Sequence, residues 1–205
     1  VGVAITAGKL GIGFTDSNVK VGNTALNSLT TGTNNTAVGK DALKTNTTGS
    51  SNAALGENSL ENNTTGSSNT GIGKDALRAN TTASDNTAVG YEALELTSTG
   101  AQNTILGSGA GRSNTTASNN TGVGYYALRS NTTGTDNVAV GSQALDANTT
   151  ASQNVAIGKN ALGGSNTGSF NTAVGHEALI SNTTGNPNTA IGANALDANT
   201  TGGSN

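Results

Sequence analysis

Few residues of this chain belong to the types that catalyse reactions, and they are scattered. The single histidine, His176, precedes Glu177, and the two could form an acid–base pair. Cleavage of a polysaccharide would need two carboxyl groups at a fixed separation, but the acidic residues form no recurring pair. The simpler interpretation of His176 is a solvated surface side chain. We therefore expect no catalytic residue and predict that the protein is not an enzyme.

Cofactor and metal sites are not indicated either. The stretch GSGAG at 107–111 resembles part of a phosphate-binding loop, but no Lys-Ser or Lys-Thr pair follows it. The chain has no cysteine, so thiolate ligands and disulfides are excluded. Calcium-binding nonapeptide repeats need an aspartate that recurs at a fixed place, and none does so here. We expect no cofactor and no metal.

The aromatic residues are better candidates for binding. Tyr91, Tyr125 and Tyr126 lie in a polar sequence and could stack on sugar rings or anchor a protein. Together with His176 they are the predicted receptor contacts, for a surface glycan or a cell-surface receptor. An alternative is that the tyrosines cover an exposed edge or pack between chains.

The composition limits the other classes of partner. Only 2% of the 205 residues are aromatic, and the net charge is −3 with no basic run. Nucleic-acid binding needs a basic patch, so we expect no nucleic-acid partner. No apolar run approaches the roughly 18 residues of a membrane helix, so we expect no membrane span in these residues.

A strict repeat with a period of seventeen organises the chain. Eleven units fill residues 18–204, Asn205 begins a further unit, and residues 1–17 form an N-terminal cap or connector. We expect the chain to be a fragment of something longer. Because insertions and deletions are absent from the units, each residue has a fixed place in a stack of coils. Asparagine always opens the unit, at Asn18, Asn35, Asn52, Asn69, Asn86, Asn103, Asn120, Asn137, Asn154, Asn171 and Asn188.

The positions of the unit predict short strands and turns. Two turn signals in each unit leave no room for a stable helix, so we predict an all-β, repetitive β-solenoid or parallel β-roll. Position 4, always Val, Leu or Ile, is expected to point inward, and the position-1 asparagines are expected to form a hydrogen-bonded ladder. The glycine at position 5 indicates a positive φ or a close backbone approach. Alanine and leucine at positions 8 and 9 begin a second strand or enter the interior.

The segment NTTG at positions 12–15 predicts a strand end followed by a turn. It also creates Asn-Thr-Thr sequons, which we interpret as turn-forming asparagines rather than glycosylation sites. The sequons begin at Asn46, Asn63, Asn80, Asn114, Asn131, Asn148, Asn182 and Asn199.

The thin interior predicts association. A coil filled by Val, Ala and Leu buries little apolar area, so we expect three stacks to join around an axis as a homotrimer. Small residues at positions 5 and 8 would allow the chains to approach closely. The sequence leaves open the handedness of the roll and whether coils close within one chain. Phe14 is expected to help plug the end of the stack.

The repeat motif resembles that of a known family. NTAVGKDAL at 35–43 and NVAIGKNAL at 154–162 are similar to the short motif of trimeric autotransporter adhesin heads. The units ending in NTTG resemble repeats of bacterial and phage fibres, including mosaic adhesive trimers. The segment 9–22 resembles one found in fibres that end in an endosialidase-type chaperone domain. This chain departs from the adhesin heads in its longer period. The resemblance implies homotrimeric, left-handed parallel β-rolls at a cell surface or in a virion fibre.

Two functions follow as hypotheses. The first is a structural and adhesive segment of an extracellular trimeric fibre, which presents receptor contacts at variable repeat positions. The second is an ice-binding solenoid, because threonine recurs at positions 13 and 14 and would form long ladders.

Overall fold

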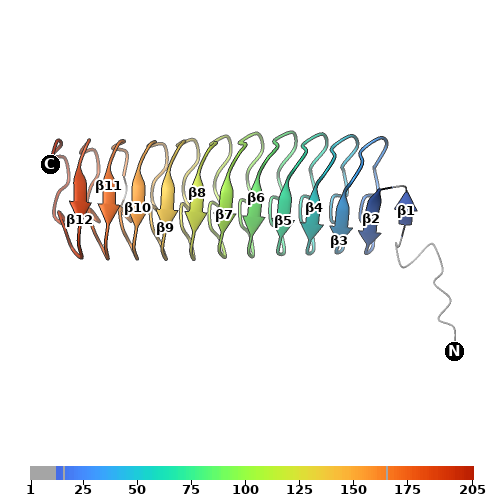
Figure 1. Ribbon diagram of the computed structural model, residues 1–205, viewed down its shortest axis with the longest axis horizontal. Coiled ribbons are helices and arrows are strands. Elements are labelled where there is room, and N and C mark those ends of the chain that lie inside the picture. Colours follow the sequence, from blue (N-terminus) through green and yellow to red (C-terminus); the bar gives the residue numbers. More distant parts are fainter. Residues whose placement is uncertain (1–12, 16, 165) are drawn as a thin grey trace, which may run out of the picture.

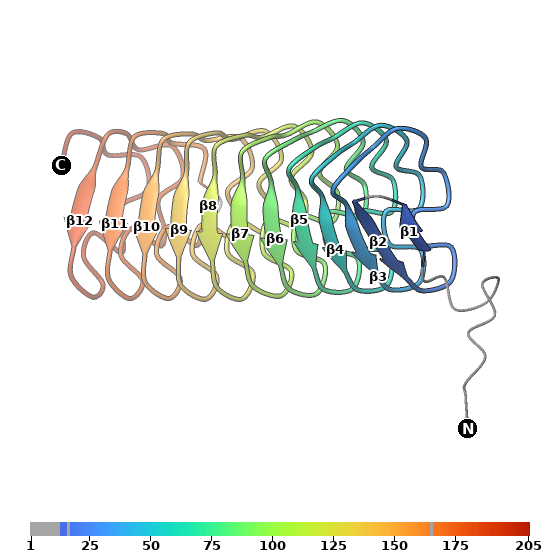
Figure 2. The ribbon, with the colours of Figure 1, turned by 45° about the vertical axis from the view of Figure 1, so that its right-hand side comes forward.

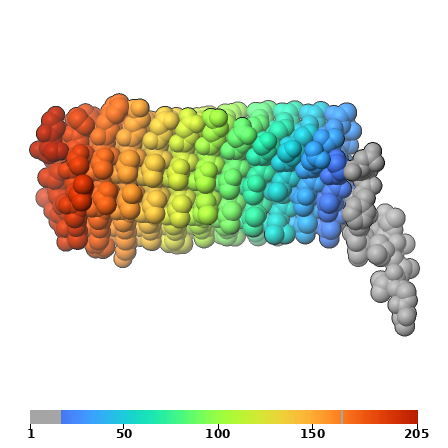
Figure 3. All heavy atoms as spheres, viewed as in Figure 1, coloured from blue at the N-terminus to red at the C-terminus, as the bar shows by residue number. Residues whose placement is uncertain are grey.

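The computed structural model describes residues 13–15, 17–164 and 166–205. In this part of the chain the protein is an all-β solenoid without helices, and neighbouring strands are offset by one repeat unit. The predicted fold class and coil length are therefore confirmed. We number the coils from coil 1 at 18–34 to coil 11 at 188–204. Figure 1 shows them stacked side by side in chain order, and Figure 3 shows the resulting narrow rod.

One short strand from each coil joins a single sheet whose order follows the chain. From β2 onward the strands are parallel and in register, as in the pairing of Ala37 with Ala54. Figure 2 shows the strands along one face of the rod and the turns around the rest. The strands are β1 Gly13–Thr15, β2 Asn18–Val21, β3 Thr36–Val38, β4 Ala53–Leu55, β5 Thr70–Ile72, β6 Thr87–Val89, β7 Thr104–Leu106, β8 Thr121–Val123, β9 Val138–Val140, β10 Val155–Ile157, β11 Thr172–Val174 and β12 Thr189–Ile191.

The first strand covers the N-terminal edge of the sheet. β1 pairs antiparallel with β2, with Phe14 opposite Val19. Because an unpaired strand edge can recruit other chains, this hairpin protects the end of the stack. Residues 1–12 and 16 of the expected cap, and the side chain of Phe14 that was expected to plug the end, lie outside the described part.

A narrow core of alanine and leucine runs along the rod. In coils 1–10 the alanines at position 8 and the leucines at position 9 are buried, as Ala42 and Leu43 illustrate. These residues lie in turns, so the interior alternative is the correct one. Position 3 of the strands supplies a third buried row, in which Ala37, Ala88 and Ala139 are completely covered.

The prediction that position 4 points inward is wrong. In β4, Ala54 is buried while Leu55 is 50% exposed, and no position-4 side chain in the described coils is buried. Successive strand residues face opposite sides, and position 9 already fills the interior, which leaves room only for a small residue at position 3. We call the outward residues the aliphatic row: Val21, Val38, Leu55, Ile72, Val89, Leu106, Val123, Val140, Ile157, Val174 and Ile191.

The glycine at position 5 combines a positive φ with a close approach. Its φ lies between 125° and 145° throughout coils 1–11. A β-carbon on Gly39 would overlap the carbonyl group of Gly56 in the next coil. The approach is therefore between coils of one chain. In coils 1–10 the position-5 glycines are half-buried and their small size is explained by packing within one chain, while position-8 alanines such as Ala42 are buried in the core. Close approach of several chains stays a prediction.

The leucines of the core adopt a left-handed backbone conformation that the sequence did not predict. Leu43 has a φ of 49°, and the other position-9 leucines lie within a few degrees of it. This conformation costs roughly 1–2 kcal/mol for a residue with a β-carbon. Complete burial of the side chain and a 3.0 Å hydrogen bond from the Leu43 amide to the Ser59 carbonyl oxygen offset that cost.

The asparagines at position 1 form a buried, hydrogen-bonded ladder. The backbone N–H of Asn35 donates a hydrogen bond to Oδ1 of Asn18 at 2.8 Å. The side-chain Nδ2 of Asn35 donates to the carbonyl oxygen of Gly49 at 2.9 Å. The same two bonds recur in the coils that follow, for example at Asn52 and Asn69. An asparagine with both bonds joins two coils and also bonds across its own coil to the turn at position 15. Asn154 makes the bond between coils, but its side-chain Nδ2 has no partner within the described residues.

A second buried asparagine row lies at position 12. The Asn63 side chain donates to Oδ1 of Asn46 at 2.8 Å and to the Gly66 carbonyl oxygen at 2.9 Å. These are the sequon asparagines, and from Asn46 to Asn182 their side chains are buried. Glycan attachment would require this row to leave the interior, which supports the interpretation of the sequons as structural.

Candidate functional site

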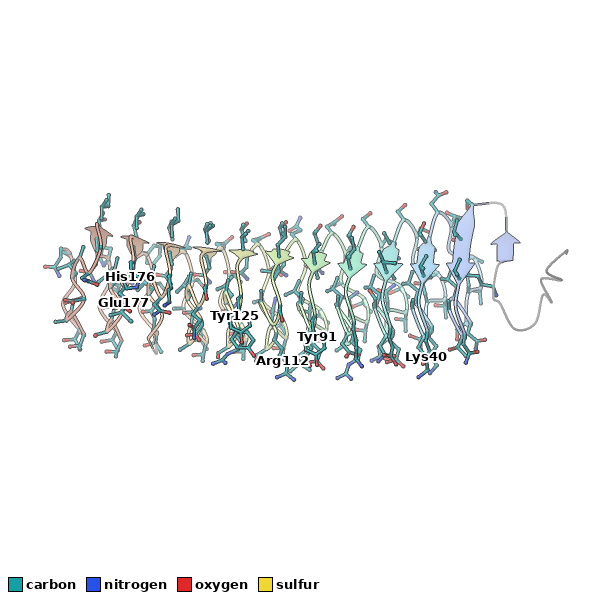
Figure 4. All side chains as sticks on the ribbon, turned by 90° about the horizontal axis from the view of Figure 1, so that it is seen from below. Lys40, Tyr91, Arg112, Tyr125, His176 and Glu177 are labelled. Carbon is teal, nitrogen blue, oxygen red and sulfur yellow. The ribbon has the colours of Figure 1, made fainter. Side chains whose placement is uncertain are left out.

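The surface offers three features that could contact other molecules. They are an ion-pair edge of lysine, arginine, aspartate and glutamate side chains, a tyrosine cluster of Tyr91, Tyr125 and Tyr126, and the aliphatic row. The first two lie on the turns at positions 6, 7 and 10, and the third lies on the sheet. Figure 4 shows Lys40, Tyr91, Arg112 and Tyr125 along the same edge of the rod.

The ion-pair edge connects charged side chains across coils 2–6. Lys74 lies 3.3 Å from Glu57, and Glu57 lies 3.5 Å from Lys40 one coil earlier. Further along, Arg112 contacts Glu95 at 2.8 Å and Glu92 at 2.9 Å. Exposed pairs contribute only about 0–1 kcal/mol each. This edge therefore connects neighbouring coils and gives the turns a hydrated, charged surface. Its carboxylates are paired with lysine and arginine side chains.

Two aspartates of the turns have shifted pKa values. A hydrogen bond from the Thr24 hydroxyl, followed by hydrogen bonding and charge from Lys44, lowers the pKa of Asp41 despite its burial. For Asp146 the largest effect is burial, which raises its pKa although Arg129 opposes the shift. Asp41 thus stabilises the fold in its charged form, whereas the charge of Asp146 is unfavourable in the folded protein.

The structure brings two of the predicted receptor contacts together. Tyr125 and Tyr126 stack with ring centroids 3.9 Å apart and ring planes 29° from parallel. The guanidinium carbon of Arg129 lies 4.8 Å from the Tyr126 ring centroid, at cation–π distance. Tyr91 occupies the same repeat position as Tyr125 but lies two coils away, and both are 50% exposed.

His176 lies apart from the tyrosines. It occupies position 6 of coil 10, three coils beyond Tyr125. Its Nε2 is 3.6 Å from Glu177, and both side chains are exposed to solvent. Glu177 also accepts a hydrogen bond from Asn160. Because both members of the pair face solvent, this geometry fits the solvated interpretation better than an acid–base pair.

The stretch 107–111 folds as the ordinary turn of coil 6. Gly107 takes the position-5 conformation, Gly109 lies under the Tyr126 ring, and Gly111 faces the interior beside Leu94 and Ile105. These glycines therefore provide space for neighbouring side chains, and no helix follows them as a phosphate-binding loop would require.

The aliphatic row is the feature that sequence reasoning missed. Leu106 and Val123 are 38% exposed, and Ile157 is 40% exposed. The row runs the length of the rod with threonine at position 2 beside it in most coils. The signal was the small residue at position 3, because only one of two adjacent strand residues can face a narrow interior.

The described part of the chain carries no metal site and no membrane-spanning helix, and comparison with known proteins gives no match. Among residues 13–15, 17–164 and 166–205, no group of His, Cys, Asp and Glu is arranged to hold a metal ion. No helix within that same part of the chain is long and apolar enough to cross a membrane. No protein-family model, curated protein or solved structure matches the chain.

Proposed function

We propose that this chain is a segment of an extracellular, homotrimeric fibre on a cell or virion surface. It acts as a rigid rod that holds a tip away from the particle or presents receptor contacts from its turns. Its role is mechanical and adhesive rather than enzymatic. Three copies would display each contact three times, so that weak contacts add.

The aliphatic row is the observation that carries this proposal. Eleven coils at about 4.8 Å each make a row on the order of 50 Å long. Seven of its eleven side chains are exposed and the other four are half-buried. Extended apolar surface of this kind marks an interaction site. Since the row is only one residue wide, three rods can bury it around a common axis. The position-2 residues, mostly threonine, would then flank the axis.

The ion-pair edge and the asparagine ladders support a mechanical role for the rod. Backbone and asparagine hydrogen bonds join successive coils, and charged side-chain contacts add to them in coils 2–6 and between coils 7 and 8. Stability of such a stack is the sum of the coils and their interfaces, so a uniform repeat gives a rod of uniform strength. A surface fibre needs that property.

A native mass measurement of the purified chain tests the proposal. We expect three chains per particle over a wide concentration range. A folded particle of one chain at every concentration would contradict it, because the aliphatic row would then be stable in water without a partner.

Ice binding is the second candidate, and the exposed threonine at position 14 of each coil favours it. The position-13 hydroxyls are less suited, since Thr47 and Thr64 donate theirs to carbonyl oxygens one coil on. The position-14 row lies in a turn rather than on the flat sheet. Thermal hysteresis of a dilute solution would support this candidate, and a freezing point equal to the melting point would exclude it.

A further inference from the structure

The tyrosine cluster contains a built platform rather than a chance group of aromatic residues. Tyr126 is its base, and Gly109 of the preceding coil makes room for it. A β-carbon on Gly109 would overlap the Tyr126 ring. The φ of Gly109 is 63°, but non-glycine residues such as Glu92 and Gln143 hold nearly the same φ at position 7 of other coils. Space for the ring, not backbone conformation, therefore explains glycine at this position.

The second ring is held in place by the first. Tyr125 stacks on Tyr126, whose own ring also contacts Arg129. Arg129 is in turn 3.6 Å from Asp146 in the next coil. Tyr125 remains 50% exposed, so a fixed aromatic ring is available to a ligand. A ring that is already ordered loses little entropy on binding.

A second exposed ring stands in line with the platform. Tyr91 and Tyr125 share position 6, and Ser108 occupies that position in the coil between them. At about 4.8 Å per coil the two tyrosines are roughly 10 Å apart along the rod. The short serine leaves the space between them open, and its hydroxyl can donate and accept hydrogen bonds.

The charges around the rings favour an uncharged ligand. Arg112 is paired with Glu92 and Glu95, and Arg129 is paired with Asp146. Both arginines are thus neutralised by the protein and offer no surplus positive charge to an anion. The Glu92 carboxylate also accepts a hydrogen bond from the Tyr91 hydroxyl, which raises the pKa of that tyrosine.

We propose that the platform of Tyr125 and Tyr126, with Tyr91 two coils away, binds a neutral glycan. The apolar faces of pyranose rings would stack on the two exposed tyrosines, and hydroxyl groups would bond to Ser108 and Glu92. The two rings then contact non-adjacent sugars of one oligosaccharide. This inference names the receptor class for the adhesive role proposed above and rests on it.

Tyrosine fluorescence gives a direct test, because the chain has three tyrosines and no tryptophan. All of its tyrosine emission therefore comes from this cluster. The probes are cellobiose, maltose, lactose and their tetrasaccharide homologues where these exist, titrated to millimolar concentrations. We expect a saturable change in emission with at least one neutral probe, stronger for a tetrasaccharide than for its disaccharide. Absence of a saturable change with every probe would overturn the inference.

Matched variants separate the platform from a general surface effect. Tyr125→Ala should weaken binding about ten-fold or more, given the usual contribution of an aromatic contact. Gly109→Ala should also weaken binding by displacing Tyr126, whereas Asn160→Ala, at the same repeat position two coils beyond Tyr126, should not. His176→Ala should bind like the parent chain. Equal binding by the Tyr125→Ala or Gly109→Ala chain, each shown to be folded by circular dichroism, would contradict the platform.

Two further arms distinguish the alternatives. A sulfated oligosaccharide that binds more tightly than its neutral parent would contradict the charge argument. Native mass on the same samples separates this inference from the fibre proposal. A trimer without glycan binding overturns only the platform, and a monomer that binds glycan through Tyr125 overturns only the trimer.

Discussion

The asparagine rows and the aliphatic row invert the usual placement of polar and apolar residues. Asn46 of the position-12 row and Asn52 of the position-1 row are buried, while Leu55 of the aliphatic row is half exposed on the sheet. The asparagines tolerate burial because their amides bond to the next coil and to the turn carbonyl oxygen. The aliphatic residues have no such partner within the described part of the chain. The difference teaches that buried asparagines join the coils beside the alanine and leucine core, whereas the aliphatic row is left available for contacts outside the chain.

Truncation of a core leucine should have the largest effect on the free energy of unfolding and should distinguish core residues from the aliphatic row. Leu145→Ala is expected to lower the free energy of unfolding by about 2–5 kcal/mol, because the leucine is completely buried. Urea denaturation at two protein concentrations measures it. Val140→Ala in the aliphatic row is the control, and its cost should depend on protein concentration because it weakens association. Identical concentration dependence for both variants would remove the distinction.

Two adjacent asparagines, one buried and one exposed, test whether the buried asparagine row stabilises the fold. Asn63→Ala should cost about 1–3 kcal/mol, because the buried Oδ1 of Asn46 loses its donor and the Nδ2 of Asn80 loses an acceptor. Asn62→Ala changes the same side chain at an exposed position and should stay within about 0.5 kcal/mol of the parent. If thermal unfolding showed equal losses, the row would not be a stabilising element.

Coil 6 allows a test of how tightly the interior is packed. Ile105 stands where most other coils have alanine, and Gly111 replaces the core leucine of the same coil. Gly122 occupies the place of Ile105 in the next coil. A β-carbon on Gly122 would lie 2.8 Å from Cδ1 of Ile105. Gly122→Ala should therefore cost about 1–3 kcal/mol through overpacking.

The matching double variant sharpens this prediction. When Ile105→Ala is added to Gly122→Ala, the overpacking disappears and the two costs should not add. Simple additivity in a double-mutant cycle would mean that the two residues do not share the same space.

The smallest expected effect concerns pH at the junction of coils 1 and 2. The folded pKa of Asp41 lies below its ordinary value of 3.8. Its contribution is therefore complete above pH 3.8 and is lost as the pH falls through the lower folded value. The stability difference between the parent chain and Asp41→Asn should shrink as the pH falls below 3.8. A difference that stays constant down to about pH 2 would contradict the role of the charge.

The sequence predicted the periodicity of the fold better than the direction of its side chains. A period without insertions requires one residue per place, so coil length and the parallel sheet followed from Asn18 to Asn188 alone. The sequence misplaces position 4, because hydrophobicity alone does not indicate burial in so narrow a coil. The interior is set instead by Leu43 and its equivalents, whose left-handed backbone no propensity predicts.

The candidate contacts were predictable in type but not in arrangement. Tyr91, Tyr125 and Tyr126 stood out as the aromatics of a polar repeat. Their stacking depends on Gly109, which in the sequence belongs to a glycine-rich stretch with no evident link to tyrosine. Likewise, Arg112 meets Glu95 only because the coils align equivalent places of successive repeat units.

Sedimentation equilibrium of a row variant tests the central claim most directly. Serine replaces three aliphatic-row residues in Ile72→Ser, Val89→Ser and Leu106→Ser together, and in the control it replaces the position-2 threonines in Thr70→Ser, Thr87→Ser and Thr104→Ser. We predict that the parent and the control sediment as trimers and that the row variant sediments as a single chain with the circular dichroism of the parent. A row variant that remains trimeric would contradict the account, as would a parent chain that sediments alone.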